Sequence, residues 1–289
     1  MNYVNCNLCP RRCGVDRTAG QMGFCGAPDT ALVAKTMLHQ WEEPVLAGSG
    51  GSGAIFFSGC NLGCTYCQNR AISQKPQGIA LDGPGLRLEM ERLISQGAEN
   101  IDLITAAPYL PTVLDALSVP LPVPVVYNTG GYETAAAIQS LKGKVDIYLP
   151  DLKYADSDLA SRLSHAPDYF QVATQAIVEM VRQVGSPVFD QGKMKQGVII
   201  RHLILPGQVE NSLKVLDWIG DTFSPGQVLV SLMRQYTPMP NLQPPFDRTV
   251  TEDEYQAVLS WMYLNDLQGF TQESSAATTA FIPDFSCSQ

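Results

Sequence analysis

Three cysteines in the segment 58–69, which reads SGCNLGCTYCQN, have the spacing of ligands to one metal centre. Cys60, Cys64 and Cys67 form a C-x3-C-x2-C pattern in the loop that follows a predicted strand. A cubane iron–sulfur cluster has four irons, so three thiolates leave one iron open to a small molecule. The alternatives are a zinc site completed by a distant ligand, or three unrelated thiols. The loop position favours the cluster.

A second group of four cysteines lies near the N-terminus. Cys6, Cys9, Cys13 and Cys25 give the pattern C-x2-C-x3-C-x11-C, which is enough for a closed four-thiolate site. The segment is too short to form a core of its own, which indicates that a metal supports its folding. Zinc and a second iron–sulfur cluster both suit these thiols, and four unbound thiols are the alternative. Cys287 lies alone in a Ser-rich tail and is expected to be a bystander.

The elements that must position these cysteines follow a regular alternation. After residue 53, short β-branched runs alternate with amphipathic stretches, which is typical of βα units around a parallel sheet. Six strands are predicted, at 54–58, 101–105, 123–127, 145–149, 198–205 and 228–232. Helical periodicity predicts helices at 86–96, 133–141, 168–184, 211–219 and 252–264. The sequence therefore predicts an α/β protein.

The chain is expected to have three parts. Residues 1–52 form a Cys-rich N-terminal segment with the second metal site and a linker, residues 53–235 form the core, and residues 236–289 form a C-terminal loop, helix and tail. The run 48–53, GSGGSG, is expected to be the flexible linker. The competing interpretation is a close approach of backbone to a ligand, which glycine allows.

The C-x3-C-x-aromatic-C pattern, with Tyr66 as the aromatic residue, resembles the signature of the radical S-adenosylmethionine superfamily. The resemblance implies a partial (β/α)6, TIM-like barrel, a [4Fe-4S] cluster on Cys60, Cys64 and Cys67, and S-adenosyl-L-methionine bound to the unique iron. One-electron reduction then cleaves the sulfonium to methionine and a 5′-deoxyadenosyl radical, which abstracts hydrogen from a substrate. Backbone groups at Tyr66 would recognise the adenine.

Three further segments resemble the activating enzymes of glycyl-radical enzymes, specifically proteins similar to pyruvate formate-lyase activating enzyme. They are NTGGY at 128–132, DLK at 151–153 and RHLILPG at 201–207, and the likeness extends over most of residues 1–240. NTGGY resembles a D-T-N-G-F segment of that family. In the family, the aspartate of DLK helps to bind a monovalent cation beside the methionine carboxylate.

Side chains at the carboxyl ends of parallel barrel strands converge on one mouth, where ligands bind. A sulfonium that carries a carboxylate needs cations and hydrogen-bond donors there, and Lys153 and Arg201 supply charge. His202 is expected to contact the methionyl part of the cofactor, and the alternative is a core histidine. Asp151 is expected to pair with a cation or with Lys153, and the alternative is a solvated charge pair in a loop. The predicted cofactor-binding residues are Tyr66, Thr105, Asn128, Thr129, Asp151, Lys153, Arg201 and His202.

The segment after the second predicted strand departs from the superfamily pattern. Residues 105–109 read TAAPY, where many members carry a Gly-Gly-Glu-Pro-like segment that binds an amino group. Recognition of the amino group is therefore expected to use Thr105 and backbone carbonyls. The departure weakens the prediction of activase function more than the prediction of the cofactor, because the radical chemistry depends mainly on the cluster.

The charge balance and the apolar runs limit the partners. A net charge of −9 without any Lys/Arg run argues against a nucleic-acid partner, which would need a basic face. No apolar run reaches the roughly 20 residues that cross a bilayer, and residues 1–10 lack a charged region followed by an apolar stretch. The expectation is a cytoplasmic protein with no membrane or nucleic-acid partner, in which thiols stay reduced.

These features lead to two hypotheses from different classes. The first is an enzyme, a radical S-adenosylmethionine oxidoreductase similar to pyruvate formate-lyase activating enzyme, or one that acts on another protein, on RNA or on a small molecule. The family implies flavodoxin or ferredoxin as electron donor and a glycyl-radical protein as substrate. The second is a noncatalytic iron–sulfur protein that carries electrons or senses redox state. No catalytic residue is predicted beyond the cluster ligands.

Overall fold

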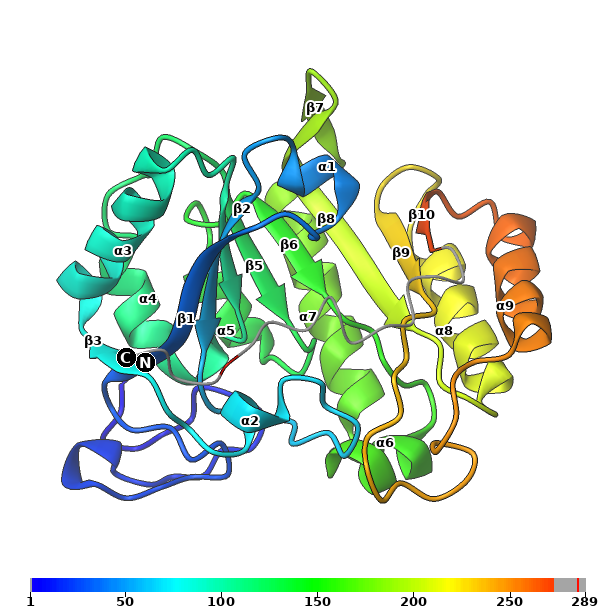
Figure 1. The fold of residues 1–289 in the computed structure, drawn as a ribbon, viewed down its shortest axis with the longest axis horizontal. Coiled ribbons are helices and arrows are strands. Elements are labelled where there is room, and N and C mark those ends of the chain that lie inside the picture. Colours follow the sequence, from blue (N-terminus) through cyan, green and yellow to red (C-terminus); the bar gives the residue numbers. More distant parts are fainter. Residues whose placement is uncertain (1, 273–284, 286–289) are drawn as a thin grey trace.

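The computed structural model describes residues 2–272 and residue 285. Figure 1 shows a broad central sheet, with α3 (Gly83–Ser95) and α4 (Leu110–Ala116) on one side of the view and α8 (Val209–Thr222) and α9 (Glu252–Leu264) on the other. The fold is α/β with a mostly parallel sheet, as the sequence predicts. Cys287 and most of the predicted tail lie outside the described residues.

Ten described strands belong to the sheet, in the order β10-β9-β8-β6-β5-β4-β2-β1-β3, with β7 paired to β8. Six neighbouring strands are mutually parallel and overlap the six predicted strands, namely β2, β4, β5, β6, β8 and β9. The strands are β1 (Ala31–His39), β2 (Ser52–Phe57), β3 (Ile79–Leu81), β4 (Ile101–Ile104), β5 (Val125–Thr129), β6 (Ile147–Pro150), β7 (Val188–Asp190), β8 (Lys193–Leu203), β9 (Leu229–Met233) and β10 (Gly269–Thr271).

The predicted helices appear within a few residues of their expected bounds, as α3, α5 (Ala135–Ser140), α7 (Tyr169–Val184), α8 and α9. Local caps account for where two of them begin. The Asp82 carboxylate accepts from the Gly85 amide at 2.8 Å before α3, and Thr251 and Glu254 form a capping box at α9. The sequence did not predict α1 (Pro44–Ala47), α2 (Arg70–Ser73), α4, α6 (Ser157–Ser164), and the 3-10 turns η1 (Arg17–Ala19) and η2 (Ala107–Tyr109).

The N-terminal segment shares the sheet with the predicted core. Strand β1 pairs antiparallel with β2, which places His39 opposite Ser52. The segment 48–53, expected to be a flexible linker, does not form one in the structure. Ser52 begins β2, and residues 51–53 are buried. A Cβ on Gly50 would lie 2.2 Å from the Gly97 carbonyl oxygen, so glycine here permits a close approach to another backbone segment.

Alternate residues of each parallel strand face opposite sides of the sheet. We call the side of the sheet that the long helices cover the outer side, and the other side the inner side. On β8, Val198 and Ile200 belong to the main core on the outer side, whereas Ile199 packs with Leu46 of α1 on the inner side. The short helix α1 therefore fills the inner side near the amino ends of the strands. The inner side near their carboxyl ends remains available for polar residues.

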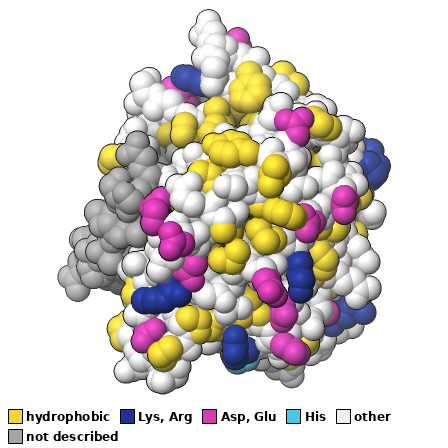
Figure 2. Space-filling model, turned by 90° about the vertical axis from the view of Figure 1, so that its right-hand side faces the viewer, with side chains coloured by type: hydrophobic (Ala, Val, Ile, Leu, Met, Phe, Trp, Pro, Cys, Tyr) yellow, Lys and Arg dark blue, Asp and Glu magenta, His cyan; other side chains and the backbone are white. Residues whose placement is uncertain are grey.

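Figure 2 shows the face that carries α8 and α9, where acidic side chains lie among apolar ones. This distribution agrees with the net charge of −9. Within residues 2–272, no helix has the length and apolar character needed to cross a membrane.

Candidate active site

The cysteine loop and the carboxyl ends of the parallel strands enclose one cavity of about 240 Å³. All three cysteines of the C-x3-C-x2-C motif line this cavity. Seven of the eight predicted cofactor-binding residues line it as well, namely Tyr66, Thr105, Asn128, Thr129, Asp151, Lys153 and Arg201. The structure thus brings together residues that are up to 141 positions apart, from Cys60 to Arg201.

Each thiol of the loop has a polar neighbour. The Ser164 hydroxyl donates to the Cys64 sulfur at 3.0 Å, Ser73 Oγ lies 3.4 Å from the Cys67 sulfur, and the Leu62 amide donates to the Cys60 sulfur at 3.4 Å. The seven described cysteines are free thiols. Donors to sulfur are the contacts that stabilise thiolates in iron–sulfur sites.

Burial raises the pKa of Cys60 to about 12, with Cys64 and Cys67 adding to the effect. Without a cation, the thiol is therefore protonated, and its thiolate form needs a metal. Among the described residues, no group of three or more His, Cys, Asp or Glu could hold a single metal ion. A cubane cluster differs from a single ion because each thiolate binds a separate iron, so the sulfurs need not meet around one point.

Behind the loop, a chain of hydroxyl groups leads to Cys64. The Tyr66 and Tyr154 hydroxyls lie 2.6 Å apart, and the Tyr154 hydroxyl lies 2.6 Å from Ser164 Oγ, which contacts the Cys64 sulfur. All four side chains are buried. The chain fixes the side chain of Tyr66 away from solvent.

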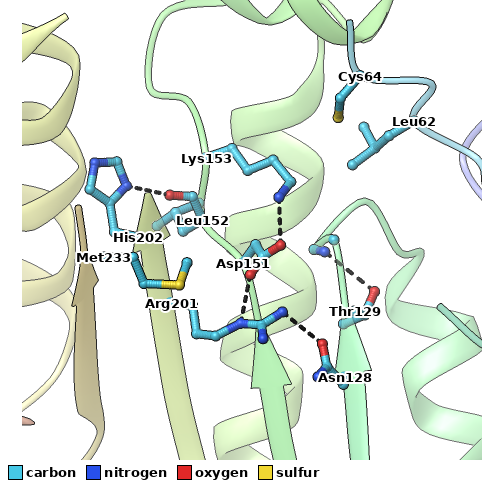
Figure 3. A network of polar contacts seen from close by, with 12 residues as sticks. Leu62, Cys64, Asn128, Thr129, Asp151, Leu152, Lys153, Arg201, His202 and Met233 are labelled. Atoms are coloured by element: carbon cyan, nitrogen blue, oxygen red, sulfur yellow. Dashed lines mark hydrogen bonds and ion pairs between the residues drawn. The ribbon is translucent and has the colours of Figure 1, made fainter. Parts of the chain in front are cut away.

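Asp151 is the centre of a charged network at the cavity floor (Figure 3). Arg201 Nε donates to Asp151 Oδ1 at 2.8 Å, and Lys153 Nζ donates to Asp151 Oδ2 at 2.5 Å. Arg201 also donates to the Asn128 side-chain oxygen at 2.6 Å. Burial alone would raise the pKa of Asp151, but the charges of Arg201 and Lys153 outweigh it and hold this pKa below its ordinary value. Glu42 lies 3.8 Å from Arg201 on its other side, so Lys153 is the cation of this network that faces the cysteine loop.

Two threonines complete the wall. Thr105 directly follows β4 and has a φ of 62°, which is unusual for a β-branched residue, and its amide donates to the Asn128 carbonyl at 2.9 Å. The Thr129 hydroxyl donates to the buried Glu133 carboxylate at 2.6 Å. Burial raises the pKa of Glu133 to about 7. Backbone strain of this kind at the end of a strand is typical of binding sites.

His202 does not line the cavity. Its ring lies on the outer side of β8, where Nδ1 is 2.7 Å from the Leu152 carbonyl oxygen and Nε2 is 2.9 Å from Ser212 Oγ. The imidazole is fully buried, and burial lowers its pKa to about 4. The structure therefore places His202 among the core residues, because neighbours on a strand face opposite ways.

The N-terminal cysteines lie beside the cysteine loop. Cys25 and Cys60 line one cavity of about 580 Å³. Arg11 connects the two regions, since it donates to the carbonyls of Asn61 at 2.7 Å, Ser164 at 3.0 Å and Leu62 at 3.3 Å. No three of these described thiols surround one point as a single ion requires, so the metal at Cys6, Cys9, Cys13 and Cys25 stays a prediction.

A curated relative covers most of the chain. The Uncharacterized protein MJ0674 of Methanocaldococcus jannaschii is 30% identical over 269 residues, which are 89% of this chain and 74% of the relative. The chain belongs to the family of this archaeal protein. No family model matches the chain.

Two solved structures have a similar fold at low sequence identity. Streptococcus suis SuiB, solved bound to S-adenosylmethionine, is 10% identical with a TM-score of 0.50 over 76% of this chain and 50% of SuiB. A radical SAM methyltransferase from Sphaerobacter thermophilus is 13% identical with a TM-score of 0.48 over 76% of this chain and 66% of the methyltransferase. In both cases the match spans less than two thirds of the other protein. The likeness to SuiB supports the fold.

Sequence reasoning missed three acidic residues on the inner side of the sheet, Glu42, Glu43 and Asp102. Asp102 is fully buried on β4, and Asn128 Nδ2 donates to its Oδ2 and to Glu42 Oε2, both at 3.3 Å. A charged residue within the apolar run IDLIT was the available signal, since a buried strand seldom contains an unpaired carboxylate.

Proposed function

We propose that this protein is a radical S-adenosylmethionine enzyme, in which Cys60, Cys64 and Cys67 hold a [4Fe-4S] cluster. The observation that supports this best is the shared cavity of the three thiols and the network of Asp151 and Arg201. Three soft ligands and a nearby ammonium and guanidinium suit a cluster with an open iron and a zwitterionic ligand beside it.

The residues present fit such a group. Cys60, Cys64 and Cys67 are free, and their described partners include backbone amides at Cys60 and one hydroxyl each at Cys64 and Cys67. Gly130 lines the same cavity, and a Cβ there would lie 2.8 Å from Leu62 Cδ1. Glycine at this position thus permits the cysteine loop to approach the end of β5.

The side chains of the cavity have separate tasks in binding. Lys153 is placed to neutralise the methionine carboxylate, and Asp151 and Arg201 hold the position of Lys153 and Asn128 by direct hydrogen bonds. Thr105 and Thr129 offer polar groups to the amino end, where no glutamate follows β4. Backbone groups at Tyr66 would bind the adenine, as the resemblance implies. When bound, the cluster and cofactor supply a 5′-deoxyadenosyl radical for hydrogen abstraction.

Apolar walls limit access of water. Apolar side chains among the lining residues include Leu62, Leu203 and Met233, and the centroids of the Tyr66 and Tyr236 rings lie 5.8 Å apart. A reactive radical needs this exclusion, because water and solutes would quench it.

Within this class, we propose an activase similar to pyruvate formate-lyase activating enzyme, with flavodoxin or ferredoxin as electron donor and a glycyl-radical protein as substrate. The segments 128–132, 151–153 and 201–207 support this choice by their resemblance to that family. Zinc or a second cluster at the N-terminal cysteines, and a monovalent cation at Asp151, belong to the same proposal. Such a cation would have to displace the Lys153 ammonium, which now occupies one Asp151 oxygen.

The test is reductive cleavage of S-adenosylmethionine. Protein reconstituted anaerobically with iron and sulfide, then reduced, should form 5′-deoxyadenosine. The Cys60→Ala/Cys64→Ala/Cys67→Ala variant should form none. No product from wild-type protein with a full cluster would refute the enzyme and favour an electron carrier or redox sensor.

A further inference from the structure

A second cavity, of about 570 Å³, adjoins the proposed cofactor cavity on the inner side of the sheet. Both cavities are lined by Asn128, Arg201 and Met233, so a molecule in one lies next to the other. The proposed function does not use the second cavity. Its position beside the cofactor cavity suits the molecule from which hydrogen is abstracted.

The polar wall of this cavity is acidic. Glu42 and Glu43 lie between β1 and α1 and both line it, and the Glu42 side chain is only 9% exposed. The Asn128 amide donates to Glu42, and the Ser231 hydroxyl donates to Glu43. We call Glu42, Glu43 and Asp102 the acidic chamber.

Asp102 gives an independent indication of a missing ligand. Its side chain is fully buried on the inner side of β4, two residues before Ile104, which lines the cavity. The Glu42 carboxyl group lies within hydrogen-bond reach of Asp102, and burial, then this neighbour, raise the pKa of Asp102. Asn128 donates to Oδ2, whereas Oδ1 receives no donor from the described residues. A buried polar atom without a partner is costly, and a donor at this place would remove the cost.

The charge balance of the chamber favours a cation. Among the described residues that line the cavity, Arg201 is the only Lys or Arg, and its guanidinium is engaged by Asp151, Asn128 and Glu42. Burial, and then the neighbouring Glu42, raise the pKa of Glu43 to about 7. A bound cation would let these carboxylates ionise, whereas a bound carboxylate would add a like charge and find no free cation.

Three aromatic side chains are among the residues that line the cavity. They are Phe56, Phe270 and Trp41, and Trp41 is 68% exposed. Aromatic faces attract cations and pack on apolar bodies. We propose that the acidic chamber binds the substrate, and that this substrate carries an ammonium or guanidinium group on an apolar or aromatic body. This proposal rests on the radical S-adenosylmethionine chemistry proposed above, and in a protein substrate the cationic group would be a Lys or Arg side chain.

The probe is 2-phenylethylamine, compared with the neutral 2-phenylethanol, in calorimetric titration of the reconstituted holoenzyme saturated with S-adenosylmethionine. The amine should bind at least about tenfold more tightly than the alcohol. Glu43→Gln should weaken amine binding by about tenfold or more, and the exposed Glu210→Gln should not change it. Trp41→Ala, at the exposed rim, gives a second variant that should weaken binding of the amine even if Glu43→Gln fails to fold.

Two outcomes would overturn the inference. Equal binding of amine and alcohol would show that the carboxylates do not select a cation. Loss of amine binding when S-adenosylmethionine is added would show that the chamber serves the cofactor itself. Formation of 5′-deoxyadenosine is measured separately, so its absence would count against the proposed function and not against a cation-binding chamber.

Discussion

Arg201 and His202 are consecutive on β8 and face opposite sides of the sheet. The Arg201 guanidinium contacts Asp151 and Asn128 in the proposed cofactor cavity, whereas the His202 ring lies between Leu152 and Ser212 under the outer helices. Figure 3 shows the two side chains pointing apart. Only one of the pair can therefore contact a ligand in the cavity.

This geometry predicts different effects of the two residues on cofactor affinity. Arg201→Met removes a cation from the wall and should raise the dissociation constant of S-adenosylmethionine at least about tenfold, or roughly 1.4 kcal/mol. His202→Gln should leave that constant within about twofold. Equilibrium binding to protein of matched cluster content measures both. A larger effect at His202 than at Arg201 would contradict the placement.

His202 should also make stability depend on pH. Its folded pKa of about 4 lies below the ordinary value of 6.5, so the unfolded chain binds the proton more readily. The stabilising effect is fully present above pH 6.5 and is lost as pH falls from 6.5 to 4, by up to about 3 kcal/mol. Denaturant unfolding at several pH values should show a shallower fall for His202→Gln than for wild-type protein. Parallel curves for the two proteins would contradict this account.

The strand and helix pattern could be predicted from the sequence because buried parallel strands are apolar and their helices are amphipathic. The six parallel strands and α9 illustrate this. Strand β1 could not be predicted from the alternation because it lies in the Cys-rich N-terminal segment. Its pairing with β2 is a tertiary contact that the local sequence does not encode. A cofactor contact of His202 was expected because it adjoins Arg201 in the RHLILPG segment. Neighbouring side chains on a strand face opposite sides of the sheet, so only one of the two can reach the cavity. Glu42 entered no motif, since only the fold brings it to Asp102.

We expect the backbone conformation of Thr105 to lower the stability of the fold while it supports cofactor binding. A β-branched residue at a φ of 62° costs on the order of 1 kcal/mol or more, and glycine adopts this conformation freely. Thr105→Gly should therefore leave the free energy of unfolding unchanged or raise it by about 1 kcal/mol, while it weakens S-adenosylmethionine binding. Denaturant unfolding and equilibrium binding on the same preparation test this. A clear loss of stability would argue that the Thr105 side chain supports the fold instead.

The N-terminal cysteines should hold a metal that is independent of the cysteine loop. Cys6, Cys9, Cys13 and Cys25 belong to a segment with few core contacts of its own, so four thiolate bonds would supply much of its folding free energy. In the Cys60→Ala/Cys64→Ala/Cys67→Ala variant, elemental analysis should still find about one zinc, or the iron of one cluster, per chain.

Replacing Cys6 and Cys9 with Ala in that background should remove this remaining metal and expose the segment to proteolysis. Arg11 ties the segment to the carbonyls of Asn61, Leu62 and Ser164. Loss of the N-terminal metal should therefore also loosen the cysteine loop, and the Cys6→Ala/Cys9→Ala variant with an intact loop should lose cluster iron faster than wild-type protein. A loop-deficient variant that folds and contains no metal would show that the four thiols are unbound.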